Sequence, residues 1–151
     1  MTGRPGGLVL DLRCAVHAPP ETVFAALTQP ALLRKWWGPH GFTTPAVEVG
    51  LRVGGRYRFR MQPPEGEAFH LSGEYLEVDP PRRLVFSFRW EEPDPDDRET
   101  VAELSLEAVG QDTELSLVQG GFATEARLEL HRAGWTDSFE KLRDLLDPAR
   151  G

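Results

Sequence analysis

The chain has 151 residues and a formal net charge of -7, with a sequence pI of about 5.1. This acidic balance argues against a nucleic-acid binder or a protein that associates with anionic membranes, because both need clustered lysine and arginine. The single cysteine, Cys14, excludes an internal disulfide and is typical of a reducing compartment. The length fits one domain over 1–151, with a core from about 8 to 146.

The first regular element is a strand from Leu8 to Val16, in which apolar and polar residues alternate. Asp11 and Arg13 interrupt the apolar run, so it resembles neither a signal peptide nor a membrane span. We therefore expect a cytoplasmic protein without membrane insertion.

Two short helices should follow this strand. Pro19-Pro20-Glu21 is typical of a helix start, since proline is tolerated in the first turn and an acidic residue is favourable there. That helix should run to about Thr28. A second helix should begin at Pro30, reach Trp36 and end at Gly38-Pro39.

The adjacent tryptophans Trp36 and Trp37 stand where the second helix ends. Neighbouring side chains on a helix point about 100° apart, so one apolar face cannot easily bury both rings. We expect one ring to enter the core and the other to line the mouth of a cavity.

Six further strands are predicted by alternating segments separated by glycine and proline. In the strand around 55–62, Tyr57, Phe59 and Met61 face one way and three arginines face the other. Phe88 and Trp90 lie on the inward face of a later strand. The predicted ranges are 43–49, 55–62, 68–79, 82–91, 99–108 and 112–119.

The last element, from Ala123 to Leu146, has helical periodicity. His131 and Trp135 lie one turn apart on its inward face. A hydrogen-bonded structural histidine is the favoured interpretation of His131, and contact with a ligand or an acid–base role is the alternative.

The order of elements indicates an α+β fold. A curved antiparallel sheet of about seven strands, aromatic on one face, must be covered, and one long amphipathic helix is available to cover it. Such a sheet is hard to fill completely, which leaves room for a pocket. Candidate cavity residues are Trp36, Trp37, Tyr57, Phe59, Met61, Phe88, Trp90, His131 and Trp135.

Motifs for catalysis, metal or cofactor binding are not evident. The four histidines lack spacing suited to zinc, and no phosphate loop or dinucleotide fingerprint is present. Glu77 and Glu103 would reach the interior only if a bulge turned either one inward. The acidic run 91–99 is predicted to be a solvated hairpin tip, with docking of a basic partner as the alternative. We therefore assign no catalytic residue, no metal and no cofactor.

Four motifs in order resemble one known family. They are WWGP at 36–39, GEYLEVDPPRRLVFSF at 73–88, GGF at 120–122 and HRAGW at 131–135. Together they resemble the helix-grip (START-like, SRPBCC) superfamily, and within it the family related to the activator of the heat-shock-protein-90 ATPase. The resemblance implies a seven-stranded sheet gripping the C-terminal helix around an apolar cavity. Members of the superfamily bind lipids, hormones or polyketides, and some are cyclases or aromatases.

The function expected from these observations is binding of a small apolar, aromatic or lipid-like molecule by a monomer or weak dimer. The first alternative is a stress-linked interaction module with a chaperone as partner. Since the eukaryotic activator carries a second, N-terminal domain, for which this chain has no room, we rank this alternative lower. The second alternative is a cyclase- or hydrolase-like enzyme that uses the same cavity.

Overall fold

The computed structural model describes residues 8–147. Seven strands and three helices occur in the predicted order, and the boundaries differ from the expected ones by a few residues at most. They are β1 (Leu8–Val16), α1 (Pro20–Thr28), α2 (Pro30–Trp36), β2 (Thr43–Val49), β3 (Arg56–Gln62), β4 (Phe69–Asp79), β5 (Arg83–Trp90), β6 (Thr100–Val109), β7 (Asp112–Phe122) and α3 (Glu125–Leu146).

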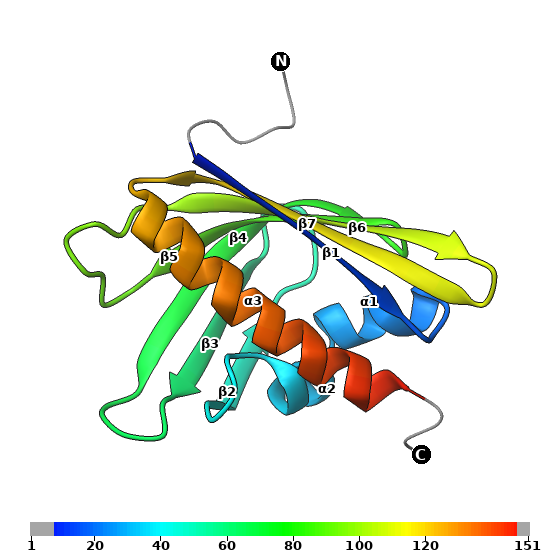
Figure 1. The fold of residues 1–151 in the computed structure, drawn as a ribbon, viewed down its shortest axis with the longest axis horizontal. Coiled ribbons are helices and arrows are strands. Elements are labelled where there is room, and N and C mark those ends of the chain that lie inside the picture. The colour runs from blue at the N-terminus through cyan, green and yellow to red at the C-terminus, as the bar shows by residue number, and fades with distance from the viewer. Residues whose placement is uncertain (1–7, 148–151) are drawn as a thin grey trace.

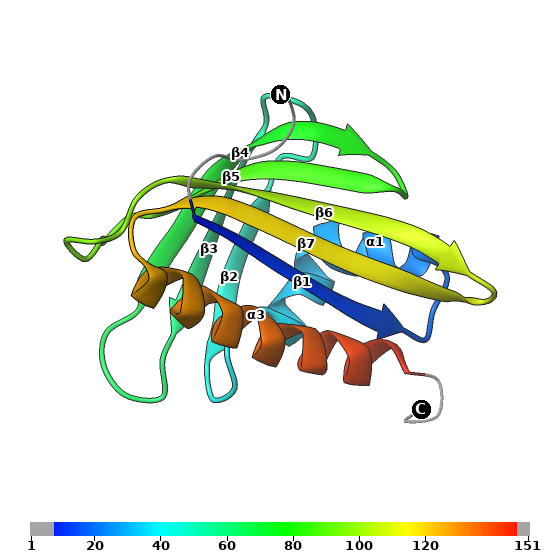
Figure 2. The same ribbon diagram turned by 45° about the horizontal axis from the view of Figure 1, so that its top comes forward.

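All seven strands form one antiparallel sheet in the order β1-β7-β6-β5-β4-β3-β2. The first strand therefore pairs with the last, and β2 forms the opposite edge. α3 runs alongside β1 on the inner side of the sheet, with α1 and α2 near its C-terminal half (Figure 1, Figure 2). This arrangement confirms the predicted α+β helix-grip fold.

The predicted alternation is confirmed residue by residue in β3. Tyr57, Phe59 and Met61 are each 3% exposed on the inner face. The arginines between them face outward, and Arg56 and Arg60 lie opposite Glu74 and His70 of β4. The Arg56–Glu74 pair places opposite charges across the two strands, which favours this solvated face.

The N-terminus of α3 is fixed by a side-chain cap. The Thr124 hydroxyl accepts a hydrogen bond from the backbone N–H of Arg127 at 3.1 Å. Such a cap satisfies one of the free donors in the first turn of a helix. From there α3 buries one face, on which Leu128, Trp135 and Phe139 contribute to the core.

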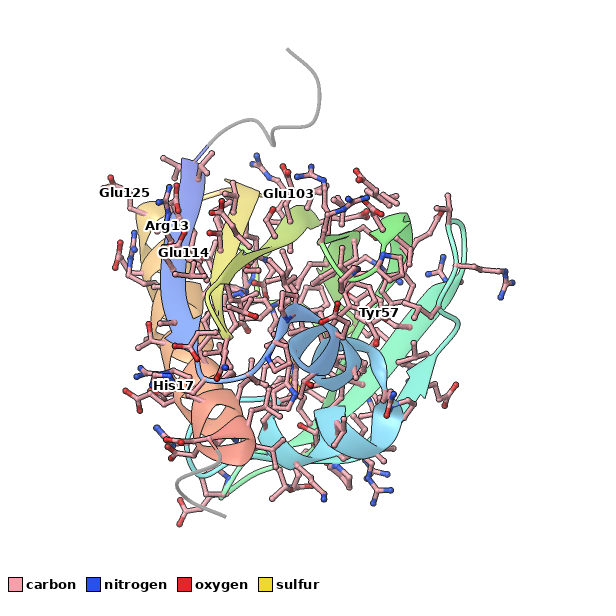
Figure 3. The ribbon with its side chains drawn as sticks, turned by 90° about the vertical axis from the view of Figure 1, so that its right-hand side faces the viewer. Arg13, His17, Tyr57, Glu103, Glu114 and Glu125 are labelled. Carbon is pink, nitrogen blue, oxygen red and sulfur yellow. The ribbon has the colours of Figure 1, made fainter. Side chains whose placement is uncertain are left out.

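The two acidic residues considered for the interior both belong to the outer face of the sheet. A bulge does occur in β4, between Tyr75 and Glu77, but it leaves the Glu77 carboxylate half-exposed and paired with Arg83. Glu103 is buried on the outer face of β6, where Arg83 donates to it. Figure 3 shows Glu103 at the edge of the molecule and Tyr57 inside it.

Candidate functional site

A pocket of about 570 Å³ opens between the first half of α3 and the ends of β3, β4 and β5. Most of its lining is apolar and comes from the loop after α2, the three strands and α3. These residues are Trp37, Pro39, Phe42, Met61, Phe69, Phe88, Trp90, Leu130, Ala133, Gly134 and Trp135. Small-molecule sites are typically concave, mainly apolar and about 300–1,000 Å³ in volume. The pocket has the size and surface of such a site.

The two adjacent tryptophans point in different directions. Trp36 is fully buried, and its indole N–H donates to the carbonyl of Ala26 in α1 at 2.9 Å. Trp37 already has an extended backbone, with φ -65° and ψ 136°, so its ring leaves the helical direction. It packs edge-on against Phe59 and Trp135, with ring centroids at 4.8 and 5.1 Å, and lines the pocket.

The structure brings six of the nine candidate residues around this pocket: Trp37, Met61, Phe88, Trp90, His131 and Trp135. Tyr57 and Phe59 instead line a second void of about 10 Å³ on the other side of Trp37. A space that small is at the lower limit for a single water molecule. Trp36 lines neither space. Contact of any of the nine with a ligand stays a prediction.

Tyr57 is a core residue that lines the smaller void. Its hydroxyl donates to the carbonyl of Ser87 at 2.6 Å, and burial raises its pKa well above the ordinary value. Its ring lies over Gly73, where an added Cβ would clash with the Ser87 carbonyl oxygen and come within 2.7 Å of the Tyr57 ring. Gly73 is therefore needed for the close approach of ring and backbone.

Both ring nitrogens of His131 are engaged in hydrogen bonds. Nδ1 lies 2.8 Å from the carbonyl of Arg127, so it must carry the proton and donate. Nε2 is then the acceptor for the indole N–H of Trp90, at 3.1 Å. Burial lowers the pKa of His131 below its ordinary value, which favours this neutral form. The geometry supports the structural interpretation of this histidine.

Gln119 is a buried polar residue that the sequence analysis did not single out. Its side-chain oxygen accepts from the indole N–H of Trp135 at 2.7 Å, and its amide donates to the Thr100 hydroxyl at 2.8 Å. The signal was present in the alternation of β7, because Thr113, Leu115 and Leu117 place Gln119 on the inward face. This contact fixes the orientation of the Trp135 ring in the pocket wall.

The wall formed by α3 contains an open position at Gly134. An added Cβ there would have Pro39 as its nearest neighbour, at 3.7 Å, which is an ordinary van der Waals distance. The neighbouring Ser138 hydroxyl donates to the Gly134 carbonyl and accepts from the Gly38 N–H at 3.1 Å. The loop after α2 is thus held against α3 at the edge of the pocket.

The acidic run after β5 forms the hairpin connection to β6, as predicted, and most of it is exposed, but its three aspartates are ion-paired and not freely solvated. Arg127, in the first turn of α3, forms ion pairs with Asp94, Asp96 and Asp97. Its side chain is only 16% exposed. The connection between β5 and β6 is therefore folded against α3, and Asp94 and Asp97 form part of the pocket rim. Arg127 lies four residues before His131, so helical periodicity could have indicated that it faces the same side.

Comparison with known proteins gives the family. The family described as "Activator of Hsp90 ATPase homolog 1-like protein" matches residues 17–147. The chain belongs to this family.

Solved structures with similar sequences share the fold. Protein CV1439 of Chromobacterium violaceum is 29% identical with a TM-score of 0.85, and the match covers 93% of this chain and 97% of that one. Protein NE0264 of Nitrosomonas europaea is also 29% identical, with a TM-score of 0.80 and coverage of 92% and 94%. The AHSA1 protein of Silicibacter pomeroyi is 30% identical, with a TM-score of 0.80 and coverage of 92% and 97%. None of the curated proteins matches the chain.

Membership of this family agrees with the resemblance seen in the four sequence motifs. Family and fold together are those of ligand-binding SRPBCC-type domains in general. Between residues 8 and 147, no helix combines the length and the apolar character that crossing a membrane requires.

Two groups of histidine and carboxylate side chains lie beside the pocket rim. In one, His40 Nε2 is 2.8 Å from the Glu140 carboxylate, and the backbone N–H of His40 donates to Asp137. In the other, His70 Nδ1 is 2.8 Å from the carboxylate of Glu92. The potential ligand atoms within each group lie within 4.8 Å of one another, so either group could hold a metal ion. In each group the histidine already contacts a carboxylate, and the expectation of no metal stays a prediction.

Proposed function

We propose that this protein, as a cytoplasmic monomer or weak dimer, binds one small apolar or aromatic molecule in the pocket beside α3. The observation that carries the proposal is the contrast between two neighbouring spaces. On one side of Trp37 the core is filled almost completely, with a void of about 10 Å³. On the other side, about 570 Å³ lined by aromatic rings is left open. Protein interiors are normally packed as densely as organic crystals, so an apolar space of this size favours a ligand.

The polar groups of the aromatic lining support the same conclusion. The indole N–H groups of Trp90 and Trp135 donate to His131 and Gln119 inside the protein. These rings therefore offer the pocket mainly their apolar faces and edges. Trp37 is different, because its indole N–H has no hydrogen-bond partner among residues 8–147. A ligand with one acceptor group could use this donor for orientation.

The test uses isothermal titration calorimetry with the neutral probe 2-naphthylmethanol. We expect the folded protein to bind about one equivalent, with a negative heat-capacity change because apolar surface is buried. Gly134→Leu should abolish this binding, since Gly134 lines the pocket and the new side chain would occupy it. Thr136→Leu is the control, because Thr136 is exposed on the same helix and lies outside the pocket lining.

Two results would contradict the proposal. One is the absence of any heat of binding in the folded wild-type protein. The other is equal binding by wild type and Gly134→Leu, which would show that the probe binds elsewhere. Circular dichroism melting curves of both leucine variants establish that each is folded under the conditions of the titration.

A further inference from the structure

The rim of the pocket is rich in negative charge. Four carboxylates line it, from Glu92, Asp94, Asp97 and Asp137, and the guanidinium of Arg127 is their counterpart in the lining. Four carboxylates against one guanidinium leave three net negative charges. Although burial opposes ionisation, hydrogen bonds from His70 hold the pKa of Glu92 below its ordinary value.

Arg127 is not free to bind an anionic ligand. Its guanidinium pairs with Asp94, Asp96 and Asp97, so one positive charge faces three carboxylates. A carboxylate or phosphate group of a ligand would have to displace at least one of these partners. It would also have to lose its own hydration beside the remaining acids, which is unfavourable for a charged group.

The groups directly behind the lining do not reverse this balance. Lys141 adds one positive charge, and its ammonium donates to the Pro39 carbonyl at 3.4 Å. Two further carboxylates, of Asp96 and Glu140, lie beside the rim residues. The electrostatic potential at the mouth is therefore set by an excess of acids, while the pocket interior is apolar and aromatic.

We infer that the pocket selects molecules whose apolar or aromatic body carries a positively charged group, such as an amine, and disfavours anions such as fatty acids. The apolar body fills the space between Trp90, Trp135 and Met61, and the cation lies at the acidic rim. Faces of the aromatic rings add a favourable environment for a cation. The inference rests on the proposed function, because it concerns the ligand of the same pocket.

The experiment compares three probes that share one apolar body and one methylene link. They are the cation 2-naphthylmethylammonium, the neutral 2-naphthylmethanol and the anion of 2-naphthaleneacetic acid. Each is titrated calorimetrically into the wild-type protein at neutral pH. At low ionic strength we expect the cation to bind roughly tenfold more tightly than the alcohol, and the anion to bind more weakly than the alcohol. At ~0.5 M salt the cation preference should shrink, because the charges near the mouth are screened.

A double variant tests whether the rim is the source of the preference. Glu92→Gln/Asp137→Asn keeps an acceptor oxygen for each of the backbone N–H groups of His70 and His40, and it reduces the net charge of the lining from three negative charges to one. The ratio of cation to alcohol affinity should then fall to about twofold, in proportion to the charge removed. The control Asp11→Asn/Glu107→Gln removes the same charge from exposed positions outside the pocket lining and should keep the wild-type ratio.

The outcomes separate this inference from the proposed function. If none of the three probes binds, the proposed function fails. If all three bind equally, or the anion binds most tightly, the pocket binds ligands but the charge selectivity is wrong. A cation preference that survives both high salt and the rim variant would also overturn the inference. The salt dependence of the wild-type protein needs no variant, so the inference stays testable if the double variant does not fold.

Discussion

A hydrogen bond between Trp90 and His131 joins β5 to α3, and its contribution to the stability of the fold can be measured. The Trp90 indole donates to His131 Nε2 at 3.1 Å. His131→Phe keeps an aromatic ring near Phe88 and Phe122, whose ring centroids lie 5.6 and 4.9 Å away, but removes the acceptor. The orphaned indole donor should cost about 1–3 kcal/mol of unfolding free energy.

A double-mutant cycle isolates the bond from the loss of packing. Trp90→Phe removes the donor and leaves Nε2 of His131 without its partner. The double variant removes both groups, so its loss of stability should be smaller than the sum of the single losses by about 1 kcal/mol. Urea unfolding followed by circular dichroism, well above pH 6.5, gives all four free energies. Additive single effects would refute the assignment of this bond.

The same histidine should make stability depend on pH. Its folded pKa lies below the ordinary value of 6.5, because burial opposes the charged form. As the pH falls below 6.5, the unfolded chain therefore takes up the proton first. The contribution of His131 is complete above pH 6.5 and is lost as the pH falls through the folded pKa. On acidification the unfolding free energy of wild type should fall more than that of His131→Phe. Equal losses would contradict the neutral form of His131 in the folded protein.

Two further predictions concern a buried amide and the partner alternative. Gln119→Leu should lower the unfolding free energy by about 2–4 kcal/mol, since the Trp135 indole and the Thr100 hydroxyl each lose their hydrogen bond to Gln119. Urea unfolding measures this loss, and a variant as stable as wild type would show that these groups find other partners. Addition of the protein should leave the ATPase rate of a heat-shock-protein-90 chaperone unchanged, because the acidic side chains that could dock a basic partner already pair with Arg127. A concentration-dependent increase in that rate, reduced by reversing charge at Asp94, would instead support the interaction-module alternative.

The order and identity of the elements could be predicted from the sequence because they depend on local patterns. The alternation in β3, the proline at the start of α1 and the helical period of α3 each depend on neighbouring residues. The curved sheet around one helix followed from the number of inward-facing aromatic side chains. Even the divergence of Trp36 and Trp37 was accessible, since adjacent rings at a helix end cannot share one face.

What each tryptophan contacts was decided only by the tertiary structure. Trp36 bonds to Ala26 in the preceding helix, whereas Trp135 bonds to Gln119 in β7. Both contacts depend on how close the helices lie to particular strands, and that distance is set by packing across the whole core. Tyr57 and Met61 are inward-facing residues of the same strand, yet Tyr57 lines the smaller void and Met61 lines the larger pocket. The periodicity of the strand is the same at both positions and does not distinguish them.

The acidic rim shows the same limit of local sequence information. A run of aspartates between two strands predicts a solvated turn when it is considered alone. In the fold, Arg127 lies opposite this run and pairs with it, although Asp94 and Arg127 are 33 residues apart in the chain. Hydrophobic periodicity indicates which face of a helix or strand turns inward, because the apolar face of a single element can be found from its own residues. Ion pairs between distant elements also require a fixed separation and orientation of two charged groups, and only the assembled fold supplies both.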